Sequence, residues 1–546
     1  STGLSDRTTL LMSETLSEHP EALRVVSPAQ VLRNFGAILQ GRKSSSFSAS
    51  AGTPAGTPLP SDGRLLSTEE KAQAERIWSE NRVSDGVDVF ISHVWGVERW
   101  RKALGLYYYL NVNAATAAAV TIWMVFLVVL LLRNGLTAMG GKDYLVPMLV
   151  YIPTAAFFVV LFSAHHFRPA LRMWLDKMCI HQSDEAMKKL GMEAMLEIVR
   201  ASDRLCILWD DTYFERLWCN AEIATFCATH GGPSGVDLVP LWLPPWIVMA
   251  MLLDILCSSL SAHFAWLSQA IAGFLTSVLG EELWVWCLAA PCIGVVQWAI
   301  SYLPLLIPNY FAMTSKIHQH EAMFQLLRGF RHAEAKCTVE TDRKVIGEHI
   351  STLFADTGDS PEQAVARFDK FMREDLLRMI REKVGAAAML PRREAFLVVL
   401  PLIFTSSAIV LSCDGADCAD SARVEMPPPP LRLDQLTAYM LLNSVVYSSG
   451  ALLVFPATYP LVLQLVGRAT RVEDDCLRAS LVLLSIVLGY CWMGLGLGVT
   501  CGLMLYATTY GGVYVVAVFA HLATLALVFW WLTSVRGPTR KRRMSL

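Results

Sequence analysis

The sequence predicts an α-helical multi-pass membrane protein with about eight spans that also carries an α/β domain. Three observations support this class. The 546 residues are 54% hydrophobic and only 17% charged, far more apolar than a water-soluble globule requires. The apolar residues form blocks long enough to cross a bilayer. Between the blocks, short buried-strand patterns alternate with amphipathic helical patterns, which is typical of a parallel sheet covered on both faces.

Eight blocks approach or exceed the roughly 20 apolar residues that a spanning helix needs. They lie at about 113–132, 145–164, 245–264, 284–306, 395–412, 437–464, 479–504 and 512–534. The apolar stretch 265–280 either extends the third helix or lies along the membrane interface. Pro291, Pro304 and Pro308 are expected to break or kink the fourth helix.

The placement of lysine and arginine orients these spans. With eight spans, the basic clusters fall on one side of the membrane, which the positive-inside rule makes cytosolic. They include Arg99, Arg101, Lys102, Arg168, Arg172, Lys177, Arg381, Lys383, Arg392, Arg393, Arg468, Arg471, Arg478 and the tail "RGPTRKRRMSL". The loops on the opposite side are short or acidic. All sizeable soluble segments are therefore predicted to be cytosolic, and the identity of the membrane stays open.

Charge and cysteine content exclude some classes of function. The formal net charge of −2 provides no field for nucleic acid, so the lipid bilayer and other proteins are the expected partners. The 13 cysteines contain no CxxC pair, which argues against a zinc ribbon or a redox dithiol. Cys413 and Cys418 either form a disulfide on the non-cytosolic side or remain two free thiols.

The chain divides into alternating soluble and apolar segments. Residues 1–83 contain "GRKSSSFSASAGTPAGTPLPS" and are expected to form a flexible N-terminal arm. The remaining segments are an α/β part at 84–112, an apolar hairpin at 113–164, a second α/β part at 165–244, a second hairpin at 245–312, a cytosolic helical region at 313–393, four spans at 394–535 and a basic tail at 536–546. In the helical region, Ser360, Pro361 and Gln363 predict a capped helix start and Gly385 its end.

The two α/β parts complete one another. "DVFISHVWG" (88–96) is a buried strand running into polar and aromatic residues, but only one helix follows before the lipid-like block. Residues 171–180, 203–209 and 236–243 read as further strands, with a helix at 187–202 between the first two. The sequence thus predicts one parallel sheet, with Val87–Ser92 as its first strand, interrupted by a membrane hairpin that leaves and returns on the same side.

These residues resemble the TIR (Toll/interleukin-1 receptor) domain, and more closely a family of multi-pass TIR-like membrane proteins of unicellular algae. The matching stretches are "DVFISHVW", "WLDKMCIHQ" and "DDTYFERLWCNAEIATF", while "VPLWLPPW" and "FRHAEAKCTVETDR" (330–343) also fit the membrane family. The TIR resemblance covers about 86–111 plus 165–244, roughly a fifth of the chain. It implies a flavodoxin-like α/β sheet and partners that are further copies of the chain or other TIR-containing proteins.

The resemblance also implies a site. Some TIR domains cleave the nicotinamide–ribose bond of NAD+, and the carboxylate essential to them corresponds to Glu222. Such a carboxylate can stabilise the oxocarbenium-like charge as nicotinamide leaves. Ser92, Trp95, Asp176 and Trp218 are the expected residues for binding NAD+, which would be a substrate rather than a resident cofactor.

Several alternatives stand beside the catalytic interpretation. Trp218 and Cys219 also fit a structural core, and Glu222 also fits a surface position or an ion pair with Arg216. Many TIR domains act only by self-association, since a fold does not imply an activity. No metal site is expected, because His165, His166, Cys179 and His181 lack zinc-ligand spacing.

The apolar blocks contain their own candidates. Asp254, Gln297, Asn443 and His521 lie in or near predicted spans, where polar groups are costly; Asp254 also lies near enough to the cytosolic end to be solvated. Gly494, Gly498 and Gly502 have GxxxG spacing and serve either intramolecular packing or dimerisation. The sequence therefore predicts a membrane-anchored TIR-like signalling or assembly protein that cleaves NAD+ in its enzymatic version. The alternative is a transporter, a channel-like protein or a structural subunit with a non-catalytic TIR-like scaffold.

Overall fold

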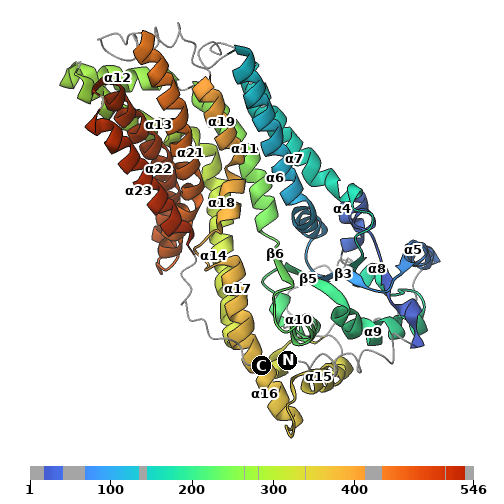
Figure 1. The fold of residues 1–546 in the computed structure, drawn as a ribbon. Coiled ribbons are helices and arrows are strands. Elements are labelled where there is room, and N and C mark those ends of the chain that lie inside the picture. The colour runs from blue at the N-terminus through green and yellow to red at the C-terminus, as the bar shows by residue number, and fades with distance from the viewer. Residues whose placement is uncertain are drawn as a thin grey trace, which may run out of the picture. The chain divides into compact units, whose positions relative to one another are not determined.

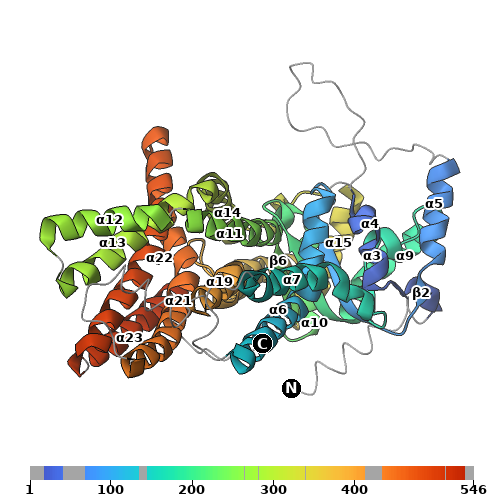
Figure 2. The same cartoon turned by 90° about the horizontal axis from the view of Figure 1, so that it is seen from above.

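The computed structural model describes residues 18–40, 68–134, 144–263, 265–280, 282–337, 340–411, 433–510 and 512–534. The chain is mostly helical and divides into two compact units, each made of three segments (Figures 1 and 2). The α/β unit comprises Ser1–Val112, Phe162–Pro245 and Gln319–Lys383. The helical unit comprises Asn113–Leu161, Trp246–His318 and Val384–Leu546.

A four-stranded parallel sheet in the order β4-β3-β5-β6 forms the centre of the α/β unit. Its strands are β3 (Val87–His93), β4 (Met173–Trp174), β5 (Ser202–Trp209) and β6 (Val236–Pro240). The prediction that the first strand shares a sheet with strands beyond the hairpin is confirmed. The second strand is shorter than predicted, because the chain turns at Asp176 into the short helix α8 (Asp176–Cys179).

Helices connect these strands. They are α6 (Arg99–Asn134), α9 (Glu185–Arg200) and α10 (Leu217–Thr229). Consecutive residues are buried along most of β3 and β5, so both faces of the sheet are covered. Helix α6 continues without a break into the first candidate span.

The N-terminal segment corrects the expectation of a flexible arm for residues 18–40 and 68–83. These residues form η1 (Pro20–Ala22), β1 (Arg24–Val25), α3 (Pro28–Val31), α4 (Arg33–Gly36), η2 (Ala37–Leu39), α5 (Thr68–Ser79) and β2 (Arg82–Val83). Val26 and Met173 exchange two backbone hydrogen bonds of 2.8 Å, so the segment caps the β4 edge of the sheet. The short apolar cluster around Val25 and Val26 is fully buried, and this burial orders the segment.

The rest of the α/β unit is helical. It contains the end of α14 (Leu306–Arg328), then η7 (His332–Glu334), α15 (Glu340–Phe354), α16 (Pro361–Phe371), the π-helical turn η8 (Met372–Leu376) and α17 (Leu377–Val384). The predicted helix start is confirmed: Ser360 and Gln363 form a reciprocal capping box with Pro361 in the first turn. Gly385 follows α17 with a φ of 75°, a left-handed conformation that glycine adopts without strain.

Seven helices among the described residues are long and apolar enough to cross a membrane. By length and composition they are Arg99–Arg133, Pro147–Phe167, Leu243–Leu260, Leu283–Ser301, Ser444–Ala469, Asp475–Ala507 and Val513–Thr533. The predicted fifth span is a pair of helices, α18 (Arg392–Val398) and α19 (Leu400–Leu411), bent by 55°. The count is therefore seven, or eight if this pair makes one span.

The second of these helices is built from η3 (Pro147–Tyr151), α7 (Ile152–Ser163) and η4 (Ala164–Phe167). Further along, α11 (Leu243–His263) is followed by a separate short apolar helix, α12 (Ala265–Leu279). Then come α13 (Leu283–Ser301), a 3-10 turn η6 (Leu303–Leu305) that contains Pro304, and α14. The predicted break thus falls at Pro304, whereas Pro291 lies inside α13 and Pro308 in the first turn of α14, where proline is tolerated.

The long helices of the helical unit lie side by side (Figure 1). They include α21 (Leu433–Ala469), α22 (Asp475–Tyr510) and α23 (Val513–Thr533). The GxxxG glycines of α22 pack against α13: a Cβ at Gly498 would lie 2.6 Å from the Ala290 carbonyl oxygen, and one at Gly502 would lie 2.7 Å from that of Cys287. Of the two roles that the sequence left open, this spacing serves intramolecular packing.

Candidate active site

Glu222 lies in a buried cluster with two hydroxyl groups. The Ser92 hydroxyl, near the carboxyl end of β3, donates a hydrogen bond to Oε2 of Glu222. Because that bond uses the only hydroxyl hydrogen of Ser92, the Tyr213 hydroxyl, 2.5 Å away, donates to Ser92. Tyr213 comes from η5 (Tyr213–Glu215), the turn between β5 and α10. Three elements, β3, η5 and α10, thus place a short hydrogen-bonded chain beside the end of β3.

Burial dominates the electrostatics of Glu222. The residue is only 9% exposed, and burial raises the pKa of its carboxyl from the ordinary 4.5 to about 8. The hydrogen bond from Ser92 opposes this increase in pKa, and the negative charge of Asp176 adds to it. The carboxyl is therefore mostly protonated at neutral pH. The surface position and the ion pair with Arg216, which the sequence left open, do not describe this buried carboxyl.

Trp95 and Asp176 form a second pair at the same end of the sheet. The indole nitrogen of Trp95 donates to Oδ2 of Asp176 over 2.6 Å. The ammonium of Lys177 lies 4.6 Å from the centre of the Trp95 ring and donates to the Gln40 carbonyl over 2.6 Å. These contacts hold a half-exposed indole between a carboxylate and a cation.

Two buried basic residues were missed in the sequence. His93 ends β3, and burial lowers the pKa of its imidazole to about 4, so the ring is neutral. Lys102, in the second turn of α6, donates to the carbonyls of Val94 and Trp95 over 3.1 and 3.4 Å. Burial lowers the pKa of its ammonium to about 8. Lys102 adjoins Ala103 and Leu106 of the buried face of α6, so its place on that face was the available signal.

Four of the five predicted site residues thus form two contacting pairs. Glu222 and Ser92 are in direct contact, as are Trp95 and Asp176, and the charge of Asp176 links the two groups. Trp218 is half-buried on α10, four residues before Glu222 and hence on the same side of the helix.

A cavity of about 500 Å³ adjoins the second group. It is lined by Trp95 and Lys177 on one side and by N-terminal residues such as Arg33, Arg76 and Trp78 on the other. Its lining does not include Glu222 or Ser92. Entry of a substrate to Glu222 would therefore require movement of the residues that cover the carboxyl.

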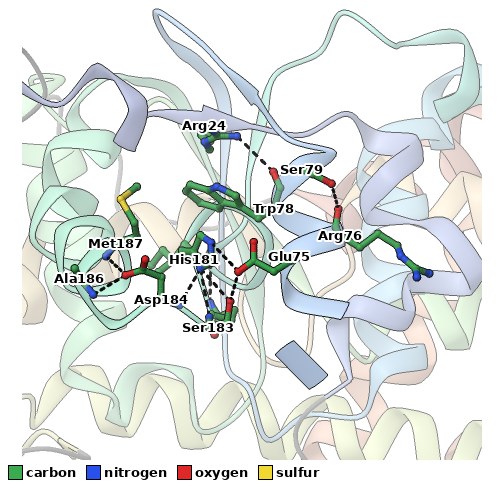
Figure 3. A network of polar contacts seen from close by, with 12 residues as sticks. Arg24, Glu75, Arg76, Trp78, Ser79, His181, Ser183, Asp184, Ala186 and Met187 are labelled. Atoms are coloured by element: carbon green, nitrogen blue, oxygen red, sulfur yellow. Dashed lines mark hydrogen bonds and ion pairs between the residues drawn. The ribbon is translucent and has the colours of Figure 1, made fainter. Parts of the chain in front are cut away.

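Contacts of α5 fix the N-terminal wall of this cavity (Figure 3). The ring of Trp78 packs on His181 at 4.7 Å between centroids, with the Arg24 guanidinium 4.2 Å from the indole. Glu75 accepts a 2.8 Å hydrogen bond from Ser183 and lies 3.5 Å from Nε2 of His181. His181 is thus part of the contact that holds α5 against residues 181–183. No group of three or more metal-ligating side chains occurs in the described part of the chain.

Comparison with known proteins does not assign the chain to a family. No protein-family model, no curated protein and no solved structure matches this chain.

Proposed function

We propose that the chain is a membrane-anchored TIR-like signalling or assembly protein whose α/β unit lies in the cytosol. The observation that carries the proposal is the split sheet: β3 precedes a segment with two candidate spans, and the other three strands of the sheet follow it. A domain completed only by chain on both sides of such a hairpin stays at the bilayer. The order β4-β3-β5-β6, second-first-third-fourth along the domain, is that of flavodoxin-like sheets, to which TIR domains are similar.

Self-association is the activity that this proposal expects first. Trp95 and Trp100 are 41% and 46% exposed in the α/β unit, and exposed indoles are favoured as anchors of protein interfaces. Two differently tagged copies, reconstituted together in nanodiscs, should therefore copurify, and Trp100→Glu should reduce the recovered partner at least about tenfold. Val345→Glu, at an exposed apolar position of α15, is the matched control. Copies that never copurify, with or without the substitution, would count against assembly.

Cleavage of NAD+ is the second candidate, favoured by the contact of Glu222 with Ser92 at the carboxyl end of β3. In this reaction the bond between the ribose C1′ and the nicotinamide nitrogen breaks and water supplies the new C1′–O bond. The products are ADP-ribose, nicotinamide and a proton. The ionised Glu222 would stabilise the positive charge that develops on the ribose. An NAD+-consumption assay on the full chain in nanodiscs, clustered and unclustered, tests this activity.

The rival class is a transporter, a channel-like protein or a structural subunit of a membrane complex in which the TIR-like unit is a scaffold. This class and the proposed one predict different effects of the same substitutions. Changes at Glu222 and Trp100 would leave its activity intact, and changes inside the helical unit would remove it.

A further inference from the structure

One acidic residue stands out in the helical unit. Asp254 lies in the second half of the candidate span Leu243–Leu260 and is 0% exposed. Neither of its carboxyl oxygens has a hydrogen-bond partner among the residues that the structure describes. This corrects the expectation that Asp254 is solvated near a helix end.

Asp254 faces protein and not lipid. Ala250 and Cys257, one turn before and after it, are fully buried on the same face of α11. Leu252 and Leu256, on the other face, are 52% and 47% exposed, as expected of lipid-facing side chains. The carboxyl group is therefore directed into the helix bundle.

The helices around Asp254 present hydroxyl and amide groups. Asn309 accepts a 3.2 Å hydrogen bond from the Trp246 indole and donates one of 3.0 Å to the Tyr490 hydroxyl. The rings of Tyr302 and Tyr490 are 5.3 Å apart, and Tyr459 packs edge-on against Trp246 at 5.2 Å. All three tyrosines lie within electrostatic range of the Asp254 carboxyl. Helices α14, α21 and α22, together with Tyr302 at the end of α13, thus meet near the part of α11 that carries Asp254.

The other polar residues in or near the candidate spans either have a hydrogen-bond partner or have side chains outside the described residues. His521 contacts the Thr500 hydroxyl at 3.1 Å, and Gln297 accepts from Ser268 over 3.4 Å. The Asn443 side chain lies outside the described residues. Asp254 is thus the candidate whose polar atoms the described chain leaves unsatisfied, and a buried unpaired carboxylate is strongly destabilising.

We propose that Asp254 and the tyrosine hydroxyls around it bind an exchangeable monovalent inorganic cation, with Na+ and K+ as the probes. One carboxylate and neutral oxygens balance a single positive charge. A divalent ion would retain a net charge in the bundle and prefers more carboxylates. A proton would neutralise the acid as well and donate its new O–H to one hydroxyl oxygen, whereas a cation engages several oxygens at once. A cation held between the carboxylate and the hydroxyl oxygens neutralises the acid and gives both kinds of oxygen a partner.

Cation-dependent stability of the full chain in nanodiscs tests this site. In wild type, Tm should rise by roughly 2–4 °C for each tenfold increase of Na+ or K+ above half-saturation, relative to N-methyl-D-glucamine at equal ionic strength. Radioactive sodium should bind and be displaced by the unlabelled ion. Asp254→Asn should abolish both effects, and Tyr490→Phe should weaken them at least about tenfold, because one neutral ligand is lost.

Glu473→Gln, which removes an exposed acid from the loop between α21 and α22, is the control and should respond as wild type does. The wild-type comparison does not depend on whether Asp254→Asn folds. A wild-type Tm that is insensitive to both cations would overturn the proposal. So would an equal response in Asp254→Asn, or a response to pH alone, which would make the site a proton site.

Discussion

The Ser92 hydroxyl donates a hydrogen bond to the carboxyl group of Glu222, 130 residues further along the chain. This contact joins the end of the first strand to the helix that follows the third strand of the sheet, across the apolar hairpin. Tyr213 extends it on the other side of Ser92. The chain Tyr213–Ser92–Glu222 is therefore the most direct probe of whether the α/β unit is an enzyme or a scaffold.

If the unit cleaves NAD+, Glu222→Gln should lower kcat/KM about 10²-fold or more. The substitution keeps the shape of the side chain but removes the charge that stabilises the oxocarbenium ion. Asp211→Asn, at an exposed acid after β5, should change the rate little. If wild-type protein consumes no NAD+ even when clustered, catalysis is excluded and assembly is the proposal that remains.

The rate of that reaction should rise with pH. The reactive form of Glu222 is the carboxylate, and burial raises the pKa of its carboxyl to about 8. For the free enzyme, kcat/KM should therefore increase about tenfold per pH unit below this value and level off above it. A pH–rate profile in nanodiscs measures this, and a rate that falls from pH 6 to pH 8 contradicts Glu222 as the ionised group.

Glu222 should also make folding stability depend on pH. Between its unfolded pKa near 4.5 and its folded pKa of about 8, the native state binds more protons than the unfolded state. The contribution is complete below the unfolded value and is lost as pH rises through the folded value, so the free energy of unfolding falls with pH across this window. Denaturant unfolding of wild type and Glu222→Gln from pH 5 to pH 8.5 should show a smaller decrease in the variant. Equal slopes would mean that the carboxyl titrates normally.

The sidedness of the soluble segments follows from the basic clusters. Residues 99, 177, 350, 470 and 540 should all lie on the cytosolic side, so cysteines introduced at position 540 and at the exposed neighbours 98, 185, 348 and 471 should react with an impermeant maleimide from that side of intact membranes. The native exposed Cys476 is replaced by serine beforehand. Labelling of position 185 and position 540 from opposite sides would exclude the eight-span arrangement and favour an odd number of spans.

Close packing of α22 on α13 should make its glycines intolerant of side chains. Gly498→Ala places a Cβ 2.6 Å from the Ala290 carbonyl oxygen and should destabilise the helical unit by about 1–3 kcal/mol. Gly273→Ala, in α12, has no atom within 4 Å of its Cβ and should be neutral or stabilise by up to about 1 kcal/mol. Thermal unfolding in one lipid composition compares the two. A dimer lost in Gly498→Ala without loss of stability would point to an intermolecular role instead.

The sequence by itself determined the features that depend on neighbouring residues. The apolar blocks of α13 and α22, the capping box of Ser360 and the alternation of buried strands with helices all follow from local hydrophobicity and backbone chemistry. The split sheet could also be predicted, because a buried strand without partners must find them elsewhere in the chain.

Tertiary structure alone decided the features that depend on which distant surfaces meet. The sequence predicts a flexible N-terminal arm because a polar linker dominates its composition. In the structure, Val26 forms backbone hydrogen bonds with Met173, which is distant in the sequence. Glu222 could be picked out by its motif, but its hydrogen bond with Ser92, and that of Ser92 with Tyr213, join residues that meet only once the sheet has formed. Asp254 is unsatisfied because the helical unit buries it while no described residue supplies a partner to its carboxyl, and this desolvation cannot be read from the apolar residues beside it in α11.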